Sequence, residues 1–126
     1  MFITTSKLYC IAPEILAKEN YFDLQAADIW AIGPILYCLF TFDVRGPWEK
    51  ATMENLKYYY FRNEYWDEWE RRILLQWGGG RNIYTLKMVQ FMASNNLTAL
   101  LRGICQHLPN QRFSLEQIQQ NGWMAP

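Results

Sequence analysis

The fold is decided by residues 28–42, which read Asp-Ile-Trp-Ala-Ile-Gly-Pro-Ile-Leu-Tyr-Cys-Leu-Phe-Thr-Phe. The apolar run at 29–42 spans 14 residues, and an aspartate bounds it on each side. A membrane-spanning helix needs about 20 apolar residues at a rise of about 1.5 Å per residue. The run therefore predicts a helix over about 25–42 that is apolar nearly all round and buried at the centre of a globular domain.

Pro34 lies inside this predicted helix. An interior proline removes one backbone hydrogen bond and costs about 3 kcal/mol. We therefore expect a kink in the helix near Trp30 to Gly33.

Shorter helical segments flank the central helix, so the sequence predicts a mainly α fold. Residues 1–11 show no helical period, and Pro13 then stands at a permitted early position of a short helix. Ser114 followed by Gln117 resembles a capping box for the last helix. The other expected helices cover 53–61 with Thr52 as cap, 64–75, a segment within 81–93, and a helix that starts at Asn95 or Asn96 and ends at Leu108.

Composition limits the class of protein. The 126 residues are 51% hydrophobic and 17% aromatic, which supplies enough burial for one globular unit over 1–126. The 12 Lys+Arg balance 12 Asp+Glu, so the chain has no general attraction for nucleic acid or anionic membrane. The three cysteines form no C-x-x-C pair and favour a reducing compartment, the cytosol or the nucleus.

Residue types typical of hydrolysis or metal chemistry are scarce. His107 is the single histidine, and its place near a predicted helix C-terminus suggests a dipole partner rather than a base. No G-x-S-x-G motif occurs, and the triple glycine at 78–80 lacks the Lys-Ser/Thr of a phosphate loop. We predict no metal and no cofactor bound by this chain.

Four short motifs occur in a fixed order. They are Ala12-Pro13-Glu14, Asp28-Ile29-Trp30-Ala31-Ile32-Gly33, Pro109-Asn110-Gln111-Arg112 and Asn121-Gly122-Trp123-Met124. With A-P-E, D-x-W-x-[IL]-G and P-x-x-R in this order, the chain resembles the C-terminal lobe of eukaryotic serine/threonine protein kinases. The resemblance covers nearly the whole chain and implies the helical C-lobe portion of the kinase fold without the β-rich N-lobe. The short sequences A-P-E-I-L and I-L-Y-x-L are similar to those of the calmodulin-dependent-kinase-like branch.

The resemblance implies structural roles for the motif residues. Glu14 would pair with Arg112 and tie the activation segment to the base of the lobe. Asp28 would accept backbone N–H bonds from the catalytic loop. Trp30 would pack under the A-P-E segment, and Trp123 would fill the base near the last helix. The structural set implied is Ala12, Pro13, Glu14, Asp28, Trp30, Gly33, Arg112 and Trp123.

Two further groups of residues follow from the resemblance. Ile35 and Leu39 would anchor the apolar column that rises to the adenine, and we expect them to be core residues within the lobe. The substrate-docking loop would hold the family threonine at either Ser6 or Lys7, and Ser6 is preferred because Tyr9 then takes the aromatic place. Cys10 stands where that aromatic would otherwise lie.

The groups that transfer phosphate are missing from the sequence. Kinases need a Gly-rich loop, a Lys–Glu pair, a catalytic-loop Asp and Asn, and the Asp of D-F-G. No H-R-D, D-F-G or G-x-G-x-x-G occurs in the 126 residues. The resemblance therefore implies a partial domain whose partners are a protein substrate or the missing kinase half, with MgATP bound only by the complete parent kinase. Asp28 and the apolar column would then be left partly unmatched.

The rival interpretation is a non-catalytic kinase-like interaction module. It would bind a protein partner through the helix after Trp48. Trp48 stands where the family has a Pro-aromatic pair, directly before a helix that often docks partners.

Overall fold

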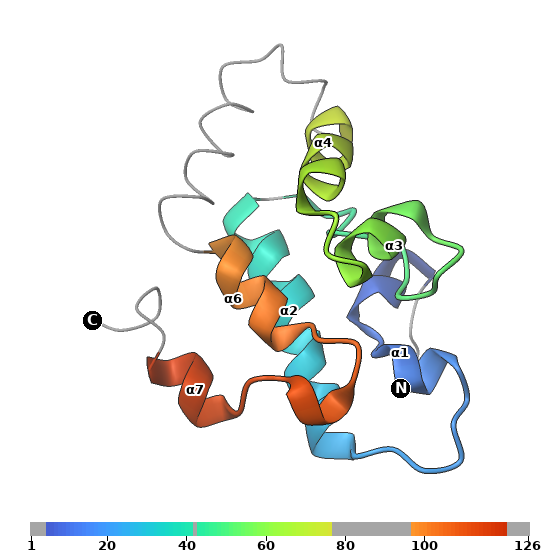
Figure 1. The fold of residues 1–126 in the computed structure, drawn as a ribbon, viewed down its shortest axis with the longest axis vertical. Helices are drawn as coiled ribbons and strands as arrows, with labels where there is room; N and C mark the ends of the chain where they lie inside the picture. The colour runs from blue at the N-terminus through green and yellow to red at the C-terminus, as the bar shows by residue number, and fades with distance from the viewer. Residues whose placement is uncertain (1–4, 42, 77–96, 121–126) are drawn as a thin grey trace.

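The computed structural model describes residues 5–41, 43–76 and 97–120. Within these ranges every regular element is helical, which confirms the predicted mainly α class (Figure 1). The elements are η1 (Thr5–Cys10), α1 (Pro13–Leu16), α2 (Leu24–Thr41), α3 (Leu56–Arg62), α4 (Trp66–Gln76), α6 (Leu97–Ile104), η2 (Pro109–Gln111) and α7 (Leu115–Gln120).

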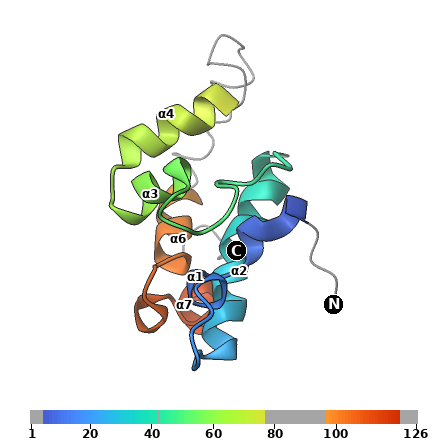
Figure 2. The same ribbon diagram turned by 90° about the vertical axis from the view of Figure 1, so that its right-hand side faces the viewer.

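Helix α2 is the central element, as its apolar run predicts. It contacts α6, η1 and η2, and Figure 2 shows it between α6 and the η1 segment. Asp23 caps its N-terminus, because the Asp23 Oδ1 accepts from the backbone N–H groups of Gln25 at 2.9 Å and Ala26 at 3.2 Å. The cap fixes the start of α2 within one residue of the predicted position.

Helix α6 compensates for the proline inside α2, which is helical from Leu24 to Thr41. Pro34 has no N–H, so the Trp30 carbonyl loses its usual intrahelical donor. The thiol of Cys105, the residue directly after α6, donates to that carbonyl at 3.5 Å. Gly33 permits this approach, because a Cβ at that position would collide with the Cys105 Sγ. The thiol therefore occupies the acceptor that the proline leaves open, and the helix assignment continues through Pro34 without a break.

An aromatic cluster joins α2 to the layer formed by α3 and α4, which pack on each other. The Trp48 ring lies 5.4 Å from Trp30, 5.2 Å from Tyr58 and 4.8 Å from Phe61, between ring centroids. Phe61 continues the cluster to Trp69 on α4 at 5.4 Å. All five side chains are buried, and their tilted or edge-on contacts are the favoured geometries for aromatic pairs.

The start of α3 differs from the prediction. The helix begins at Leu56 rather than Met53, and its cap is Asn55 rather than Thr52. The Asn55 Oδ1 accepts from the Tyr58 N–H at 3.2 Å. Both Asn and Thr are good capping residues, so local sequence does not separate the two positions.

The C-terminal helices are partly as predicted. The capping box is confirmed, because the Ser114 Oγ accepts from the Gln117 N–H at 3.1 Å and the Gln117 Oε1 accepts from the Ser114 N–H at 2.8 Å. Helix α6 ends at Ile104 and not at Leu108. The segment at 81–93 and both expected caps at 95–96 lie outside the described residues.

Candidate functional site

Glu14 and Arg112 form a buried ion pair. The Arg112 Nη1 donates to the Glu14 Oε2 at 2.7 Å, and the Nη2 donates to the Oε1 at 2.6 Å. The two side chains are 4% and 1% exposed, respectively. Two parallel bonds between guanidinium and carboxylate are the strong, geometrically specific form of this interaction. The pairing that the resemblance implied is therefore present.

Arg112 has all of its hydrogen-bonding capacity satisfied. Besides the two bonds to Glu14, it donates to the carbonyls of Gln106 at 2.8 Å, Ala26 at 3.0 Å and His107 at 3.2 Å. These contacts match the five N–H donors of a guanidinium. Burial alone would raise the pKa of Glu14, but the Arg112 hydrogen bonds and charge hold this pKa below its ordinary value. Arg112 thus joins α1, α2 and the segment after α6.

The other motif residues lie in the same buried region, as far as the structure describes them. Ala12 and Pro13 are buried beside Glu14, and Trp30 is fully buried against Trp48. Gly33 provides the close approach to α6. Trp123 lies outside the described residues.

The opposite situation holds on another face of α2. Ile35 and Leu39 are 47% and 62% exposed, so the expectation that they are core residues is wrong, whereas the expectation that the apolar column is left partly unmatched in this chain is confirmed. Leu24 and Asp28 are exposed as well, and spacings of four, seven and four residues place all four on one helix face. Among the described residues, Asp28 has no hydrogen-bond or ion-pair partner. We call Leu24, Asp28, Ile35 and Leu39 the open stripe.

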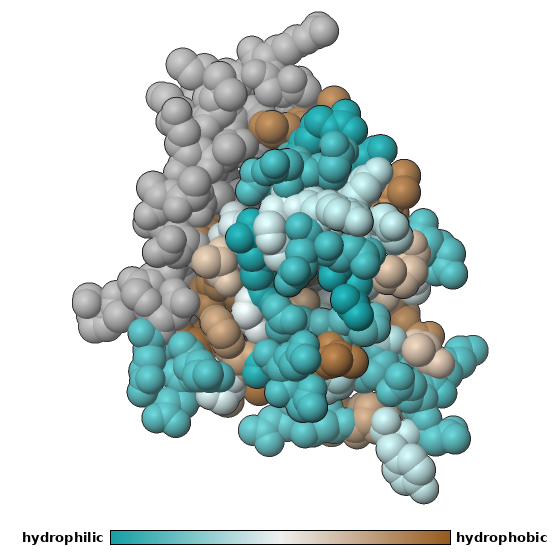
Figure 3. All heavy atoms as spheres, in the orientation of Figure 1, coloured by the Kyte–Doolittle hydropathy of each residue, from teal (hydrophilic) through white to brown (hydrophobic). Residues whose placement is uncertain are grey.

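Exposed apolar side chains occur on several described segments, and those of the open stripe lie in a row along one helix face. The face in Figure 3 is largely hydrophilic and interrupted by small apolar areas. Among the described helices, α2 is the one that is long and apolar enough to cross a bilayer. Central helices of globular domains also meet this criterion of length and composition. An apolar stripe with a single carboxylate is therefore the surface of interest.

The expected docking loop forms η1, where the sequence predicted no helix. Tyr9 takes a buried aromatic position: its carbonyl accepts from the Trp48 Nε1 at 3.3 Å, and its phenol is hydrogen-bonded to Cys38. Burial and this contact raise the pKa of Tyr9. Gly46, at φ +77°, lies against the Tyr9 ring, where a Cβ would come within 2.7 Å of ring atoms.

The remaining docking-loop residues are less defined. Cys10 is half-buried. Ser6 and Lys7 belong to η1, but their side chains lie outside the described part, so the choice between them stays a prediction.

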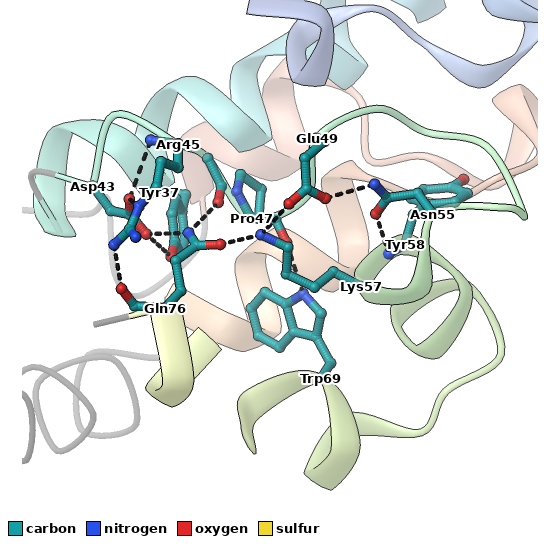
Figure 4. A network of polar contacts seen from close by, with 11 residues as sticks. Tyr37, Asp43, Arg45, Pro47, Glu49, Asn55, Lys57, Tyr58, Trp69 and Gln76 are labelled. Carbon is teal, nitrogen blue, oxygen red and sulfur yellow. Dashed lines mark hydrogen bonds and ion pairs between the residues drawn. The ribbon is translucent and has the colours of Figure 1, made fainter. Parts of the chain in front are cut away.

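A polar network that the sequence did not reveal lies between the end of α2 and the α3–α4 layer (Figure 4). At one end, the buried Asp43 carboxylate accepts from the Tyr37 hydroxyl at 2.9 Å, the Gln76 Nε2 at 2.5 Å and the Arg45 Nε at 3.2 Å. Asp43 and its partner Gln76 are 33 positions apart, so no short motif could have identified the network.

The network continues along α3. The Gln76 Oε1 accepts from the Lys57 Nζ, and Lys57 also pairs with Glu49 at 2.9 Å. Asn55 donates to the second Glu49 oxygen at 2.5 Å. The cap of α3 and the end of α4 are thus held in one connected set of contacts.

His107 differs from the sequence interpretation. It lies three residues beyond the end of α6, and its Nδ1 is hydrogen-bonded to the Tyr58 hydroxyl at 2.8 Å. Burial, with the nearby Arg62 and Arg112 charges, lowers the pKa of His107. His107 is therefore a hydrogen-bond partner of Tyr58 rather than the predicted dipole partner of a helix end.

A buried Glu–Arg tie beside a central helix is the framework of a helical kinase lobe, and comparison with known proteins agrees. Residues 2–124 match the sequence profile of the protein kinase domain, so the chain belongs to the protein kinase family.

Two curated relatives carry kinase names. The chain is 29% identical over 118 residues to serine/threonine-protein kinase CHK1 of Saccharomyces cerevisiae, and 30% identical over 115 residues to putative sperm motility kinase W of Mus musculus. The alignments cover 90% and 91% of this chain but only 18% of each relative. No solved structure matches significantly. The likeness to the calmodulin-dependent-kinase-like branch stays a prediction.

Proposed function

We propose that residues 1–126 act as a partial serine/threonine kinase domain that supplies the substrate-docking platform and anchors a catalytic loop carried by another segment. The open stripe on α2 is the observation that carries this proposal. A helix whose other face is buried presents three apolar side chains and one carboxylate to solvent along this stripe. On cysteine usage we place the protein in the cytosol or the nucleus.

The chemistry of the stripe specifies what would cover it. Exposed leucine and isoleucine side chains favour an apolar partner surface, because covering them removes apolar area from water. The Asp28 carboxylate offers acceptor lone pairs, which suit backbone N–H groups of an incoming loop. A kinase segment with a catalytic loop and apolar side chains offers both.

The complete kinase reaction moves the γ-phosphoryl group of MgATP to a protein hydroxyl. The residues of this chain do not fit that group. The sequence lacks the Gly-rich, H-R-D and D-F-G motifs, and the described residues contain no cluster of three or more His, Cys, Asp or Glu side chains that could hold a metal. We therefore assign docking and support to this chain, and no phosphoryl-transfer step.

Reconstitution tests the proposal. The purified chain is mixed with a separately expressed serine/threonine kinase segment that carries the Gly-rich loop, H-R-D and D-F-G, and transfer from labelled ATP to a generic protein acceptor is measured. We expect transfer by the mixture and a blank for the chain alone. Asp28→Asn should lower the transfer, whereas Asp67→Asn, an equal charge change at an exposed site of α4, should not. A mixture no more active than the added segment alone would contradict the proposal.

The non-catalytic interaction module remains a second candidate. The network from Asp43 through Gln76 to Glu49 favours it, because it fixes the region around α3 without any help from a catalytic half. A lone chain that melts sharply as a monomer and binds no hydrophobic dye would favour this function over the first.

A further inference from the structure

We infer that a pocket between α3 and α4 docks an acidic, leucine-containing segment of a partner protein. The α3–α4 pocket has a volume of about 460 Å³ and is lined by Arg45, Glu49, Leu56, Lys57, Arg72, Leu75 and Gln76. This site requires no catalytic half and does not involve the open stripe; because it includes α3, the helix after Trp48, it deepens the second candidate function and rests on it.

The floor of the pocket is preorganised. Lys57 is buried, and its ammonium is held by Glu49 and by the Gln76 side chain (Figure 4). Gln76 is itself fixed by the Asp43 carboxylate and the Gly46 carbonyl, at 2.5 and 3.0 Å. A ligand would therefore meet a surface that needs little ordering on binding, which favours affinity.

Arg72 supplies the positive charge that remains, because Lys57 pairs with Glu49 and Arg45 pairs with Asp43. Arg45 uses two of its donors on the Asp43 carboxylate and the Gln76 carbonyl, and its side chain is 58% exposed. Arg72 lies 5.7 Å from the Tyr60 ring centroid and lines the pocket; its Nε is buried, so its terminal N–H groups are the donors that a ligand would meet. A planar guanidinium with open donors matches a carboxylate in a bidentate arrangement.

The rest of the lining identifies the ligand as a peptide. Leu56 and Leu75 are each more than half exposed and flank the charged groups, so they favour an apolar side chain next to the carboxylates. The lining cations Arg45, Lys57 and Arg72 meet two carboxylates, Glu49 in the lining and Asp43 behind it, so one positive charge is unpaired. Because Lys57 and Arg45 are already paired, the site has one unmatched positive charge, which a single carboxylate balances, whereas a doubly charged phosphate beside Glu49 leaves an excess of negative charge. We therefore commit to aspartate or glutamate as the anionic residue.

Fluorescence anisotropy with the full chain tests the inference. The probe is a labelled peptide of alternating aspartate and leucine residues, compared with asparagine and phosphoserine versions of the same peptide. Arg72→Gln should weaken binding of the aspartate peptide about fivefold, the change typical of one ion pair. Arg71→Gln is the matched control, because Arg71 precedes it on α4, bonds to Glu68 and does not line the pocket. It should leave affinity unchanged.

The apolar contacts have their own pair of variants. Leu75→Ser should also weaken binding, whereas Leu115→Ser, at a similarly exposed leucine on α7, should not. Circular dichroism confirms that each variant is folded. The inference is overturned if the aspartate peptide does not bind below about 1 mM, if the two arginine variants behave alike, or if the phosphoserine peptide binds better than the aspartate peptide.

Discussion

The two faces of α2 have similar apolar composition but differ in exposure: one face is buried and the other lies in solvent. On the α6 side, Trp30, Gly33 and Tyr37 are buried, and even the carbonyl left open by Pro34 finds a donor. On the open stripe, comparable side chains remain in solvent. The difference shows that an apolar helix surface predicts burial on every face. It does not predict whether the covering segments belong to the same chain.

The largest effect is expected on the covered side, at the ion pair. Glu14→Ala strands the buried Arg112 charge and should cost about 3 to 5 kcal/mol, enough to abolish cooperative melting of a small domain. Glu19→Ala, at an exposed glutamate nearby, should leave the thermal melting curve unchanged. An unaltered melting curve for Glu14→Ala would show that the pair does not support the fold.

The contact between α2 and α6 should give the next largest effect. Gly33→Ala inserts a Cβ against the Cys105 thiol and should cost about 1 to 3 kcal/mol. Cys105→Ala leaves the Trp30 carbonyl without its donor, at a similar cost of about 1 to 3 kcal/mol.

The double variant separates this explanation from two independent losses. Alanine at position 105 removes the sulfur that the new Cβ would meet, so urea unfolding should show that the double variant loses less free energy than the sum of the singles. Additive losses would contradict the contact.

Acid should weaken the covered side in two stages. The folded-state pKa of both His107 and Glu14 lies below the ordinary values of 6.5 and 4.5. The folded protein thus binds fewer protons than the unfolded chain, and stability falls as pH falls through each group's titration range. Unfolding free energy measured from pH 8 to pH 3 should decline first below about pH 6.5 and again below about pH 4.5. His107→Gln should remove the first decline, and a first decline that persists in this variant would contradict the assignment.

The smallest stability change is expected on the open stripe. Leu39→Ser should alter the unfolding free energy of the lone chain by no more than about 0.5 kcal/mol, because the side chain is exposed. It should reduce hydrophobic dye binding and self-association. Leu100→Ser, at a fully buried leucine of α6, is the contrasting variant and should destabilise strongly. Equal losses for both would show that the stripe is buried in solution.

Sequence reasoning succeeded where local pattern or motif order carries the information. The apolar run located α2, and Ser114 with Gln117 located the start of α7. The Glu14–Arg112 pair, 98 residues apart, came from the family resemblance and not from any local signal.

Sequence reasoning failed where tertiary context decides. The helical spacing of apolar residues predicts that Ile35 and Leu39 are buried, but it does not identify the segment that would cover them. The α3–α4 pocket escaped notice because its cations are separated along the chain: the packing of α3 on α4 brings Lys57 and Arg72 together, and the contacts of Arg45 with Asp43 and Gln76 place the third.

Thermal melting of the chain with and without the catalytic kinase segment tests the central claim most directly. The lone chain should melt broadly and bind hydrophobic dye, and the added segment should raise its melting temperature by several degrees, because a partner that binds only the folded state stabilises it. Leu39→Asp should remove that increase while Arg71→Gln retains it. A lone chain that melts sharply, binds no dye and is unaffected by the added segment would contradict the claim that the open stripe of α2 serves another part of a kinase.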